Sequence, residues 1–294
     1  MHDKYVIALG GNAIDDIDSI SKSAAAIAKL YSKGNDIIIT HGNGPQVGML
    51  SERMDMDLAV LTAQTQAWIG AEISKCIADA LNELGIKHSH SIPEIVITYV
   101  AVNRNYGRLA AIKPIGRYMS RLESRRIVGK GFKVKKFNGG YRRVVPSPYP
   151  IAILQNDVID MLTKRRKIAI ACGGGGIPVM IMSGRMEYAD AVIDKDRSSA
   201  LLAKELKASR FFILTNVDGA YNNFGKSNQK LIERITADDL AELIKKGGFE
   251  EGSMKPKLES CIDFVKSCKR SAGIGNMSNP DYVFSLKHLT LVTP

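Results

Sequence analysis

The sequence has few cysteines, few aromatic residues and none of the common nucleotide-binding motifs. Only four cysteines and one tryptophan occur among its 294 residues, and Phe, Trp and Tyr together make up 6%. No two cysteines form a C-x-x-C pair and no histidine cluster lies near them, so we expect buried thiols in a reducing compartment and no structural zinc. The pattern G-x-x-x-x-G-K-[ST] and the H-R-D and D-F-G motifs are absent, which argues against a P-loop enzyme and a protein kinase.

Long apolar runs are also missing. No stretch approaches the roughly 20 residues that cross a bilayer as a helix, and the first residues lead directly into a predicted strand. We therefore expect no signal peptide, no membrane partner and a cytoplasmic location. The composition, 45% hydrophobic and 24% charged, is typical of a globular chain with room for one large α/β domain or two lobes.

Charge is strongly unbalanced, with a formal net charge of +11. Such an excess suits a nucleic-acid-binding protein or an enzyme whose ligands are anions. Much of it lies in one basic block, which consists of Arg117, Arg121, Arg125, Arg126, Lys130, Lys133, Lys135, Lys136, Arg142 and Arg143. Few aromatic residues interleave these cations and no nucleic-acid-binding motif accompanies them. We therefore interpret the block as a solvated surface and expect no nucleic-acid partner.

Strand and helix patterns alternate in the first hundred residues. Residues 5–9 and 36–40 are short apolar runs that lead into glycine-rich loops, as buried strands do. Residues 20–31 and 58–84 have the apolar spacing of helices, and 94–102 is a β-branched run. The alternation predicts a mostly parallel sheet covered by helices on both faces. Ligands of such sheets bind beyond the carboxyl ends of the strands.

The alternation is interrupted between residues 103 and 150. This segment is basic and contains several Gly and Pro residues, and we interpret it as an inserted subdomain or lid. The alternation then resumes. The expected strands are 167–171, 210–215 and 289–292, and the expected helices are 153–164, 197–206, 236–246 and 256–269.

Three glycine-rich loops follow predicted strands, at residues 10–12, 42–44 and 173–176. Glycine lets backbone N–H groups turn toward an anion and lets a phosphate approach closely. One such loop is weak evidence, because a turn between strand and helix often needs glycine for its geometry alone. Three loops at one edge of a sheet, two of them containing asparagine, favour an anion-binding site.

Isolated lysines and carboxylates follow the predicted strands of the second half. Lys195 lies between Asp194 and Asp196 just before a predicted helix, whose N-terminus attracts anions. Lysines neutralise the oxygens of a transferred phosphoryl group, and carboxylates hold such lysines in place. The alternative is that Asp196 caps the helix and Lys195 is solvated.

Lys113, Asp218 and Lys257 are open to two interpretations as well. Lys113 precedes a proline in an extended segment, and Asp218 follows a strand in the sequence Asn-Val-Asp-Gly. Lys257 lies near the start of a predicted helix, where a bound anion would offset the unfavourable helix dipole. Each of the three also fits an ordinary surface or turn residue.

Taken together, these segments resemble the carbamate kinases of the amino acid kinase family. The matching motifs keep the family's order and cover nearly the whole chain; they are Leu9-Gly-Gly-Asn-Ala13, Thr40-His-Gly-Asn-Gly-Pro-Gln-Val-Gly48, Lys113-Pro-Ile-Gly116, Gly140-Tyr-Arg-Arg-Val-Val-Pro-Ser-Pro148, Gly173-Gly-Gly-Gly-Ile-Pro178, Ala191-Val-Ile-Asp-Lys-Asp196 and Leu214-Thr-Asn-Val-Asp218. The fourth and the sixth motifs are specific to carbamate kinases within the wider family.

The resemblance implies an open αβα sandwich with a mostly parallel central sheet, the amino acid kinase fold, and a small protruding subdomain at about 103–150. Residues 1–165 would form an acceptor-binding lobe, and residues 166–294 a nucleotide-binding lobe. The implied reaction is a reversible, direct in-line phosphoryl transfer between ATP and carbamate that gives ADP and carbamoyl phosphate. It would use Mg²⁺ and take place in a homodimer. The physiological direction does not follow from the residues.

The resemblance also implies roles for individual residues. Catalysis would rest on Lys113, Lys195, Asp196 and Lys257. The acceptor and the transferred phosphoryl group would be bound by Gly10, Gly11, Asn12, Gly42, Asn43, Gly44, Gly174 and Gly175. The nucleotide would be bound by Asp194, Thr215, Val217, Asp218, Tyr221, Met254 and Lys257. No side chain is assigned as a metal ligand.

Several positions depart from the family's pattern. The usual Ser-Met-Gly-Pro-Lys is Ser253-Met-Lys-Pro-Lys257 here, which adds Lys255 either beside the nucleotide site or on the surface. Arg117-Tyr118-Met119 replaces Pro-Phe-Tyr, and the stretches 15–19 and 50–58 are shorter than in relatives. These changes surround the acceptor site and the lid. A kinase for another small carboxylate or phosphate acceptor therefore stays an alternative, as does a non-catalytic nucleic-acid or regulatory binding protein.

Overall fold

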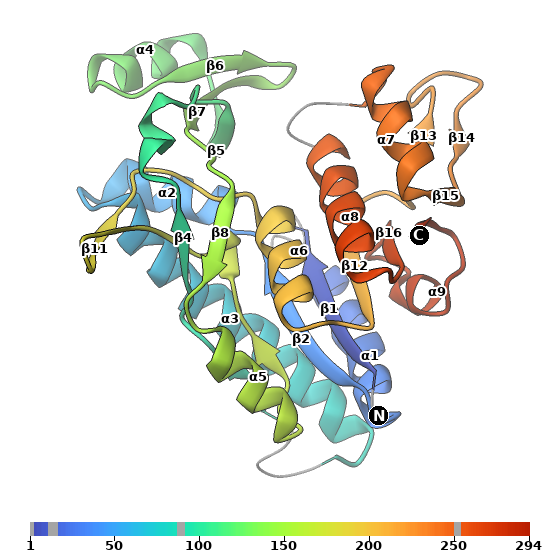
Figure 1. Cartoon of the computed structure of the whole chain (residues 1–294). Helices are drawn as coiled ribbons and strands as arrows, with labels where there is room; N and C mark the ends of the chain where they lie inside the picture. The colour runs from blue at the N-terminus through green and yellow to red at the C-terminus, as the bar shows by residue number, and fades with distance from the viewer. Residues whose placement is uncertain (1–2, 11–16, 87–91, 250–253) are drawn as a thin grey trace.

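An eight-stranded sheet forms the centre of the computed structural model, which describes residues 3–10, 17–86, 92–249 and 254–294. All neighbouring strands in this sheet are parallel except β16 and β17. In spatial order the strands are β15 (Arg234–Thr236), β17 (Leu289–Thr293), β16 (Ala272–Asn276), β12 (Arg210–Thr215), β1 (Lys4–Leu9), β2 (Asp36–His41), β9 (Ala169–Ile170) and β3 (Glu94–Ile95). The predicted mostly parallel sheet is confirmed (Figure 1).

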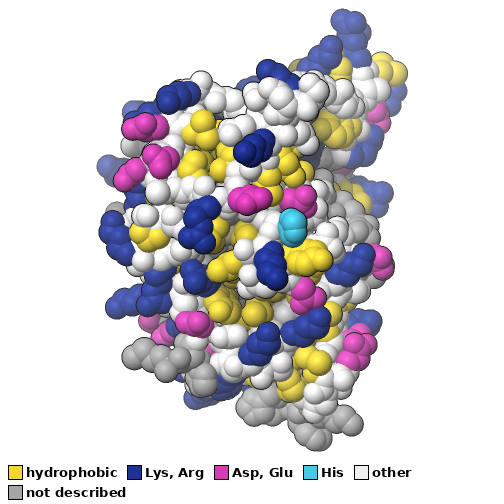
Figure 2. Space-filling model, turned by 90° about the vertical axis from the view of Figure 1, so that its right-hand side faces the viewer, with side chains coloured by type: hydrophobic (Ala, Val, Ile, Leu, Met, Phe, Trp, Pro, Cys, Tyr) yellow, Lys and Arg dark blue, Asp and Glu magenta, His cyan; other side chains and the backbone are white. Residues whose placement is uncertain are grey.

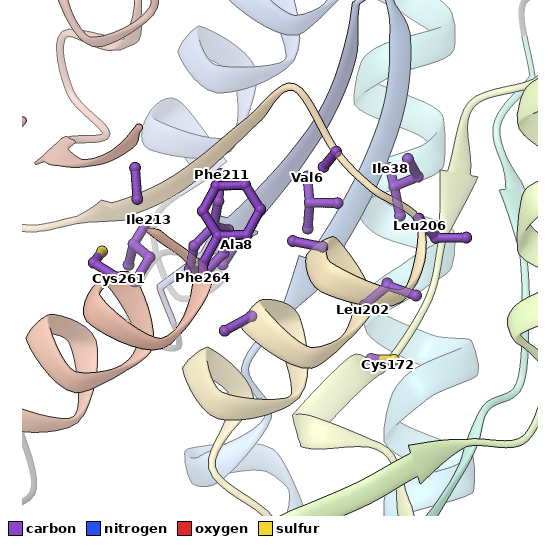
Figure 3. Close-up of a cluster of buried hydrophobic side chains, with 14 of the residues drawn as sticks. Val6, Ala8, Ile38, Cys172, Leu202, Leu206, Phe211, Ile213, Cys261 and Phe264 are labelled. Atoms are coloured by element: carbon purple, nitrogen blue, oxygen red, sulfur yellow. The ribbon is translucent and has the colours of Figure 1, made fainter. Parts of the chain in front are cut away.

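Helices cover both faces of this sheet (Figure 1). One layer contains α1 (Ile17–Ser32), α3 (Leu58–Glu83) and α9 (Pro280–Phe284), and the other contains α5 (Asn156–Lys164), α6 (Lys195–Glu205), α7 (Ala237–Lys245) and α8 (Met254–Cys268). Alternate side chains of a strand point to opposite faces. Ile7 and Leu9 accordingly pack in the core with α1 and α3, whereas Val6 and Ala8 pack with α6 and α8 (Figure 3). The αβα sandwich is therefore confirmed.

The cysteines behave as small hydrophobic residues. Cys172 and Cys261 are buried in the core that Figure 3 shows, whereas Cys76 and Cys268 are only partly buried. All four are free thiols. The expectation of buried cysteines is therefore right for two of them.

None of the described helices combines the length and the apolar character needed to cross a bilayer. The longest described helix, α3, has 26 residues, and only one of its faces is buried.

The segment 94–102, expected as a single strand, divides between two sheets. The N–H of Val96 donates to Ile170 O in the large sheet (2.8 Å), whereas Thr98 O already accepts from the N–H of Ile177 (2.8 Å) in a second sheet. The second sheet has the order β11 (Arg185–Tyr188), β10 (Ile177–Met182), β4 (Tyr99–Val102) and β8 (Pro150–Ile153). A two-stranded sheet of β13 (Tyr221–Asn222) and β14 (Lys230–Leu231) completes the body.

Strand β16 was not expected from its sequence, Ala-Gly-Ile-Gly-Asn, because glycine usually weakens a strand. The glycines are required here by close packing. A Cβ on Gly273 would lie 2.9 Å from Phe212 Cδ1, and a Cβ on Gly275 would lie 2.4 Å from Val283 Cγ2. A propensity argument cannot detect this, because the packing partners come from other elements.

A small subdomain projects from one end of the molecule (Figure 1). It consists of a three-stranded sheet in the order β5 (Lys113–Met119), β7 (Gly140–Val145) and β6 (Val134–Phe137), with α4 (Arg121–Gly129) between β5 and β6 in the chain. A capping box between Ser120 and Glu123 defines the start of α4. These elements occupy residues 113–145 of the range 103–150, and the short 3-10 helix η2 (Arg104–Arg108) precedes them.

The segment that contains the subdomain accounts for the whole net charge of the protein. Residues 103–150 contain thirteen Lys and Arg but a single acidic residue, Glu123, whereas the rest of the chain is nearly balanced. Most of the cations on α4 and β6 are exposed, which confirms the solvated-surface interpretation for them, but Arg142 and Arg143 are partly buried. On the face shown in Figure 2, basic side chains are scattered among acidic and hydrophobic ones.

The subdomain meets the body where α2 (Gly44–Arg53) crosses β5. Gly48 and Gly116 touch there through their backbones, since a Cβ on Gly48 would lie 1.9 Å from the Gly116 nitrogen. Gly116 also has φ +69°, a conformation that favours glycine. This contact is three residues from Lys113 and therefore helps to position that lysine.

Gly48→Ala is expected to destabilise the protein, because the added methyl group forces α2 away from β5. We expect a loss of about 2 kcal/mol or more in the free energy of unfolding, measured by urea denaturation. Gly129→Ala is the matched control, because a Cβ there would meet no atom within 4 Å, and its stability should be unchanged or slightly higher. A Gly48→Ala protein as stable as this control would contradict the close contact.

Candidate active site

A cavity of about 200 Å³ opens where the carboxyl end of β2 meets the subdomain and the start of α6. Its lining residues are Gly42, Asn43, Gly44, Pro45, Lys113, Pro114, Ile115, Arg142, Gly174, Val192, Ile193, Asp194, Lys195, Asp196 and Lys257. It lies at the sheet edge where ligands were expected. It also brings together the four residues to which the resemblance assigns catalysis.

Asp196 is the centre of a buried charge network. Its Oδ1 accepts a hydrogen bond from Lys195 Nζ at 2.5 Å, and its Oδ2 accepts one from Lys257 Nζ at 2.9 Å. Asp196 is only 2% exposed, so both contacts are shielded from water. Lys257 is 61 residues away in the sequence and reaches Asp196 because α8 packs against α6. One carboxylate thus fixes the direction of two ammonium groups.

Asp194 anchors the third lysine and begins α6. Its Oδ2 accepts a short hydrogen bond from Lys113 Nζ, which comes from the subdomain. Its Oδ1 accepts from the N–H of Asp196 at 2.9 Å, as an N-cap residue does. The alternative interpretation, in which Asp196 caps the helix and Lys195 is solvated, is therefore wrong. Lys195 is instead the first residue of α6.

Hydroxyl groups hold the first turn of α6 against the sheet. Ser198 Oγ donates to Gly175 O at 2.6 Å, and Ser199 Oγ donates to Lys195 O at 2.6 Å. Thr40, near the end of β2, lies 2.6 Å from Ser199 through their hydroxyl oxygens. These bonds leave the backbone that carries Lys195 little freedom to move.

Burial and ion pairing act in opposite directions on the ionisable groups of the cavity. Burial lowers the pKa of Lys195, and Asp196 only partly restores it. Burial also opposes the charge of Lys257, but attraction to Asp196 outweighs it and the pKa is raised. Burial would raise the pKa of Asp196, but the two lysines outweigh burial and lower it. Asp196 is therefore ionised at neutral pH.

His41 lies at the end of β2 with its ring fully inside the protein. Burial lowers its pKa to about 4, and the charge of Lys195 acts in the same direction. The imidazole is therefore neutral at pH 7. Its Nδ1 is 2.9 Å from Gly42 O, and its ring leaves no room for a side chain on Gly173. We assign His41 a packing role.

The glycine loops serve packing as well as access to the cavity. A Cβ on Gly174, which has φ +64°, would lie 2.2 Å from Asn43 Nδ2, and one on Gly175 would lie 2.2 Å from Ile193 O. Asn43 Nδ2 in turn donates to Thr65 Oγ1 at 2.9 Å. A Cβ on Gly10, which directly follows β1, would lie 3.1 Å from Leu214 O. Gly11 and Asn12 lie outside the described residues.

Comparison with known proteins identifies the family. The sequence model of the amino acid kinase family matches residues 3–276. A carbamate kinase of Thermoplasma volcanium is 40% identical to this chain, with 99% of each chain covered, and one of Staphylococcus haemolyticus is 38% identical, with 90% of each covered. This chain belongs to the amino acid kinase family, and within it to the carbamate kinases. It is a phosphotransferase.

The solved structures agree with the sequence comparison. Carbamate kinase from Giardia lamblia bound to AMP-PNP is 29% identical and superimposes with a TM-score of 0.85, with 99% of this chain and 98% of that chain covered. The recognition of the family from its motifs is confirmed, and so is the amino acid kinase fold.

Of the seven residues of this amino acid kinase that were expected to bind the nucleotide, Asp194 and Lys257 line the cavity and the other five do not. Thr215, Val217, Tyr221 and Met254 do not line it. Asp218, just beyond β12, accepts hydrogen bonds from Asn276 Nδ2 at 2.9 Å and from the hydroxyl of Tyr221 at 3.2 Å. Thr215 ends β12, which pairs with β1; Val217, Asp218 and Tyr221 follow that strand, and Met254 begins α8.

Arg142 lines the cavity although the sequence analysis selected it only as part of the basic block. Its position in a motif specific to carbamate kinases was a signal that it differs from the surface cations. Lys255, which was considered as a residue beside the nucleotide site, does not line the cavity. It lines a neighbouring hollow of about 410 Å³. The two hollows share Lys113 and Asp194.

Side chains suited to a metal are scarce in this site. Over the described ranges, no group of three or more His, Cys, Asp and Glu could hold a metal ion. Asp194 and Asp196 already accept hydrogen bonds from lysines. A divalent cation could therefore bind here mainly through oxygens of a ligand and of water.

Proposed function

We propose that this protein transfers a phosphoryl group reversibly between ATP and carbamate, giving ADP and carbamoyl phosphate. The observation that carries the proposal is the cavity in which two buried aspartates hold three lysines in its lining. A site of this charge suits a small phosphorylated anion. The relatives at 38–40% identity are named as carbamate kinases, which supports carbamate as the acceptor.

The transfer proceeds in line and without a phosphoenzyme. A carbamate oxygen attacks the γ-phosphorus of ATP, the bond to the β–γ bridging oxygen breaks, and its electron pair stays on ADP. Lys195 and Lys113 neutralise the equatorial oxygens, and Lys257 neutralises the bridging oxygen as it gains charge. Asp196 keeps two of these lysines in place. Catalysis therefore rests on positioning and on charge neutralisation.

Two lobes divide the substrates between them in this proposal. Residues 1–165 bind the acceptor and residues 166–294 bind the nucleotide. The backbone around Gly10, Gly11, Asn12, Gly42, Asn43, Gly44, Gly174 and Gly175 cradles the acceptor and the phosphoryl group. The nucleotide extends from Lys257 past Met254 to Asp218, with Thr215, Val217 and Tyr221 beside it. The AMP-PNP complex of the Giardia relative supports a nucleoside triphosphate as substrate.

Mg²⁺ bound together with the nucleotide would shield the charge of the phosphate oxygens. No protein side chain is assigned to it, because both aspartates of the cavity are paired with lysines. We place the enzyme in the cytoplasm, where its four free cysteines would stay reduced.

A second copy of the chain is the proposed partner, forming a homodimer. Strand β3 is at the edge of the large sheet, and its neighbourhood exposes Ile92, Ile95 and Ile97. Trp68, on the adjoining helix α3, is 45% exposed. Exposed apolar groups beside an open sheet edge favour an interface with another chain. Light scattering after gel filtration would measure the molar mass.

The function is tested by ATP formation from ADP, Mg²⁺ and carbamoyl phosphate. This direction avoids free carbamate, which is unstable in solution. We expect ATP to form at a rate proportional to enzyme. Protein that binds ADP but forms no ATP from carbamoyl phosphate would contradict carbamate as acceptor. Other small acyl phosphates would then be assayed in the same way.

The rate of transfer is expected to fall at alkaline pH. Burial lowers the pKa of Lys195 below its usual 10.5, so the ammonium is charged below that lowered pKa and loses its proton as the pH rises through it. The measurement is kcat/KM for carbamoyl phosphate between pH 7 and about 10. Lys195→Arg stays protonated throughout and should move the alkaline limb to higher pH. An unchanged limb in this variant would assign the titration to another group.

A further inference from the structure

Two neighbouring arginines of β7 have different surroundings. Arg142 lines the catalytic cavity, whereas Arg143 has its guanidinium carbon 3.8 Å from the centre of the Phe132 ring. This follows from the strand, because successive side chains point to opposite faces. The guanidinium carbon of Arg142 lies 5.4 Å from the centre of the Tyr118 ring, and that ring packs against Gly139.

Arg142 differs from the other cations of the cavity in having no carboxylate partner. The cavity is lined by four cations and two carboxylates. Lys113 pairs with Asp194, and two other lysines share Asp196. Within the described part of the chain no ion pair involves Arg142, and its buried Nε has no hydrogen-bond acceptor. Of the two positive charges in excess, one is therefore on this guanidinium, and the other belongs to the two lysines that share Asp196.

We propose that Arg142 binds the carbamoyl group of the substrate and thereby selects a planar acyl acceptor. The inference rests on the proposed function. The lysines are assigned to the phosphoryl oxygens, and Arg142 is assigned to the carbamoyl group. An ammonium is a point charge that suits the oxygens of a phosphoryl group. A guanidinium is a planar fork that matches the two coplanar oxygens of a carboxylate. Carbamate has such a carboxylate.

In this proposal Arg142, which lines the cavity, also takes part in the chemical step. During ATP synthesis a β-phosphate oxygen of ADP attacks the phosphorus of carbamoyl phosphate. The bond from phosphorus to the carbamoyl oxygen breaks, and its electron pair stays on that oxygen, so that carbamate leaves as an anion. Its two oxygens then share the charge. N–H groups of Arg142 donate to these oxygens, and the interaction strengthens as the charge develops.

The experiment compares Arg142→Lys and Arg142→Ala with Lys136→Gln in the assay of ATP formation. Arg142→Lys keeps the charge but loses the fork, and we expect the KM for carbamoyl phosphate to rise about tenfold or more. The KM for ADP should stay within about twofold, because the fork does not contact the nucleotide. Lys136 is an exposed cation on the adjoining strand β6 and should leave both constants unchanged when replaced.

A second readout separates binding from structural support. Guanidinium ion added to Arg142→Ala should restore part of the lost activity, and sodium chloride at the same ionic strength should not. Unchanged KM values in Arg142→Lys, or loss of activity in Arg142→Ala without rescue and with a lowered melting temperature, would overturn the assignment. A wild-type protein that forms no ATP would overturn the proposed function and this inference together, whereas an active wild type with an unaffected Arg142→Lys would overturn the inference alone.

Discussion

Lys195→Ala is expected to lower the turnover of ATP formation by about two orders of magnitude or more, the usual effect of removing a charge partner of the transition state. Lys195 is the first residue of α6, and it lines the cavity with its ammonium bonded to Asp196. Its backbone is held by Ser199 and its ammonium by Asp196. No other described residue occupies this position. In the variant, water would fill the space of the ammonium group but would not supply its positive charge.

Steady-state kinetics of Lys195→Ala and Lys204→Ala would test this prediction. Lys204 is a matched control because it belongs to the same helix and also pairs with an aspartate, Asp263, at 2.6 Å, but does not line the cavity. The control should keep turnover near the wild-type value. Melting temperatures would show that both variants fold. Near-normal turnover in Lys195→Ala would remove this lysine from the mechanism.

Asp196→Asn is expected to destabilise the protein by about 3–5 kcal/mol at pH 7, because it leaves two buried ammonium groups without their shared counterion. It should also lower turnover, since Lys195 and Lys257 lose the carboxylate that directs them. Urea denaturation would measure the free energy of unfolding. Asp263→Asn is the matched control, since Asp263 is in an exposed ion pair with Lys204, and its effect should stay below about 1 kcal/mol.

The difference in the free energy of unfolding between wild type and Asp196→Asn should depend on pH. The pKa of Asp196 is lowered in the folded protein, because attraction to the two lysines outweighs burial. A group of this kind stabilises the fold above its unfolded pKa, which is about 3.9, and the contribution is lost as the pH falls through the lower, folded pKa. The difference in the free energy of unfolding should therefore have its largest value at pH 7 and become smaller below about pH 4. A difference that persisted unchanged in acid would argue against the ionised carboxylate as its source.

Local patterns predicted most elements of the large sheet, because its strands are short apolar runs and its first helices end at glycines. Local patterns failed where a strand depends on packing or pairing partners that are distant in the sequence. Strand β16 contains two glycines that only Phe212, Leu289 and Val283 explain. The run 94–102 divides because its two halves pair with different strands.

The sequence predicted most residues of the candidate site, but it did not predict how they are arranged in space. The motifs selected Lys113, Lys195, Asp196 and Lys257, and all four line one cavity. Arg142 also lies in one of the motifs, but it was grouped with the basic block, whose other members are mostly solvated, and was not assigned to the site. The two arginines of β7 are adjacent in sequence and differ only in the face of the strand to which they belong.

The sequence alone determined the properties that depend on composition and on neighbouring residues. These are the class of fold, the concentration of charge in the subdomain, the glycine loops and the family to which the motifs belong. Tertiary structure decided which charges meet. Lys113 pairs with Asp194 across 81 residues and Lys257 with Asp196 across 61, because the subdomain docks through Gly48 and Gly116 and α8 packs against α6. Ion pairs form over a few ångströms, and only the packing of whole elements brings such distant side chains within that range.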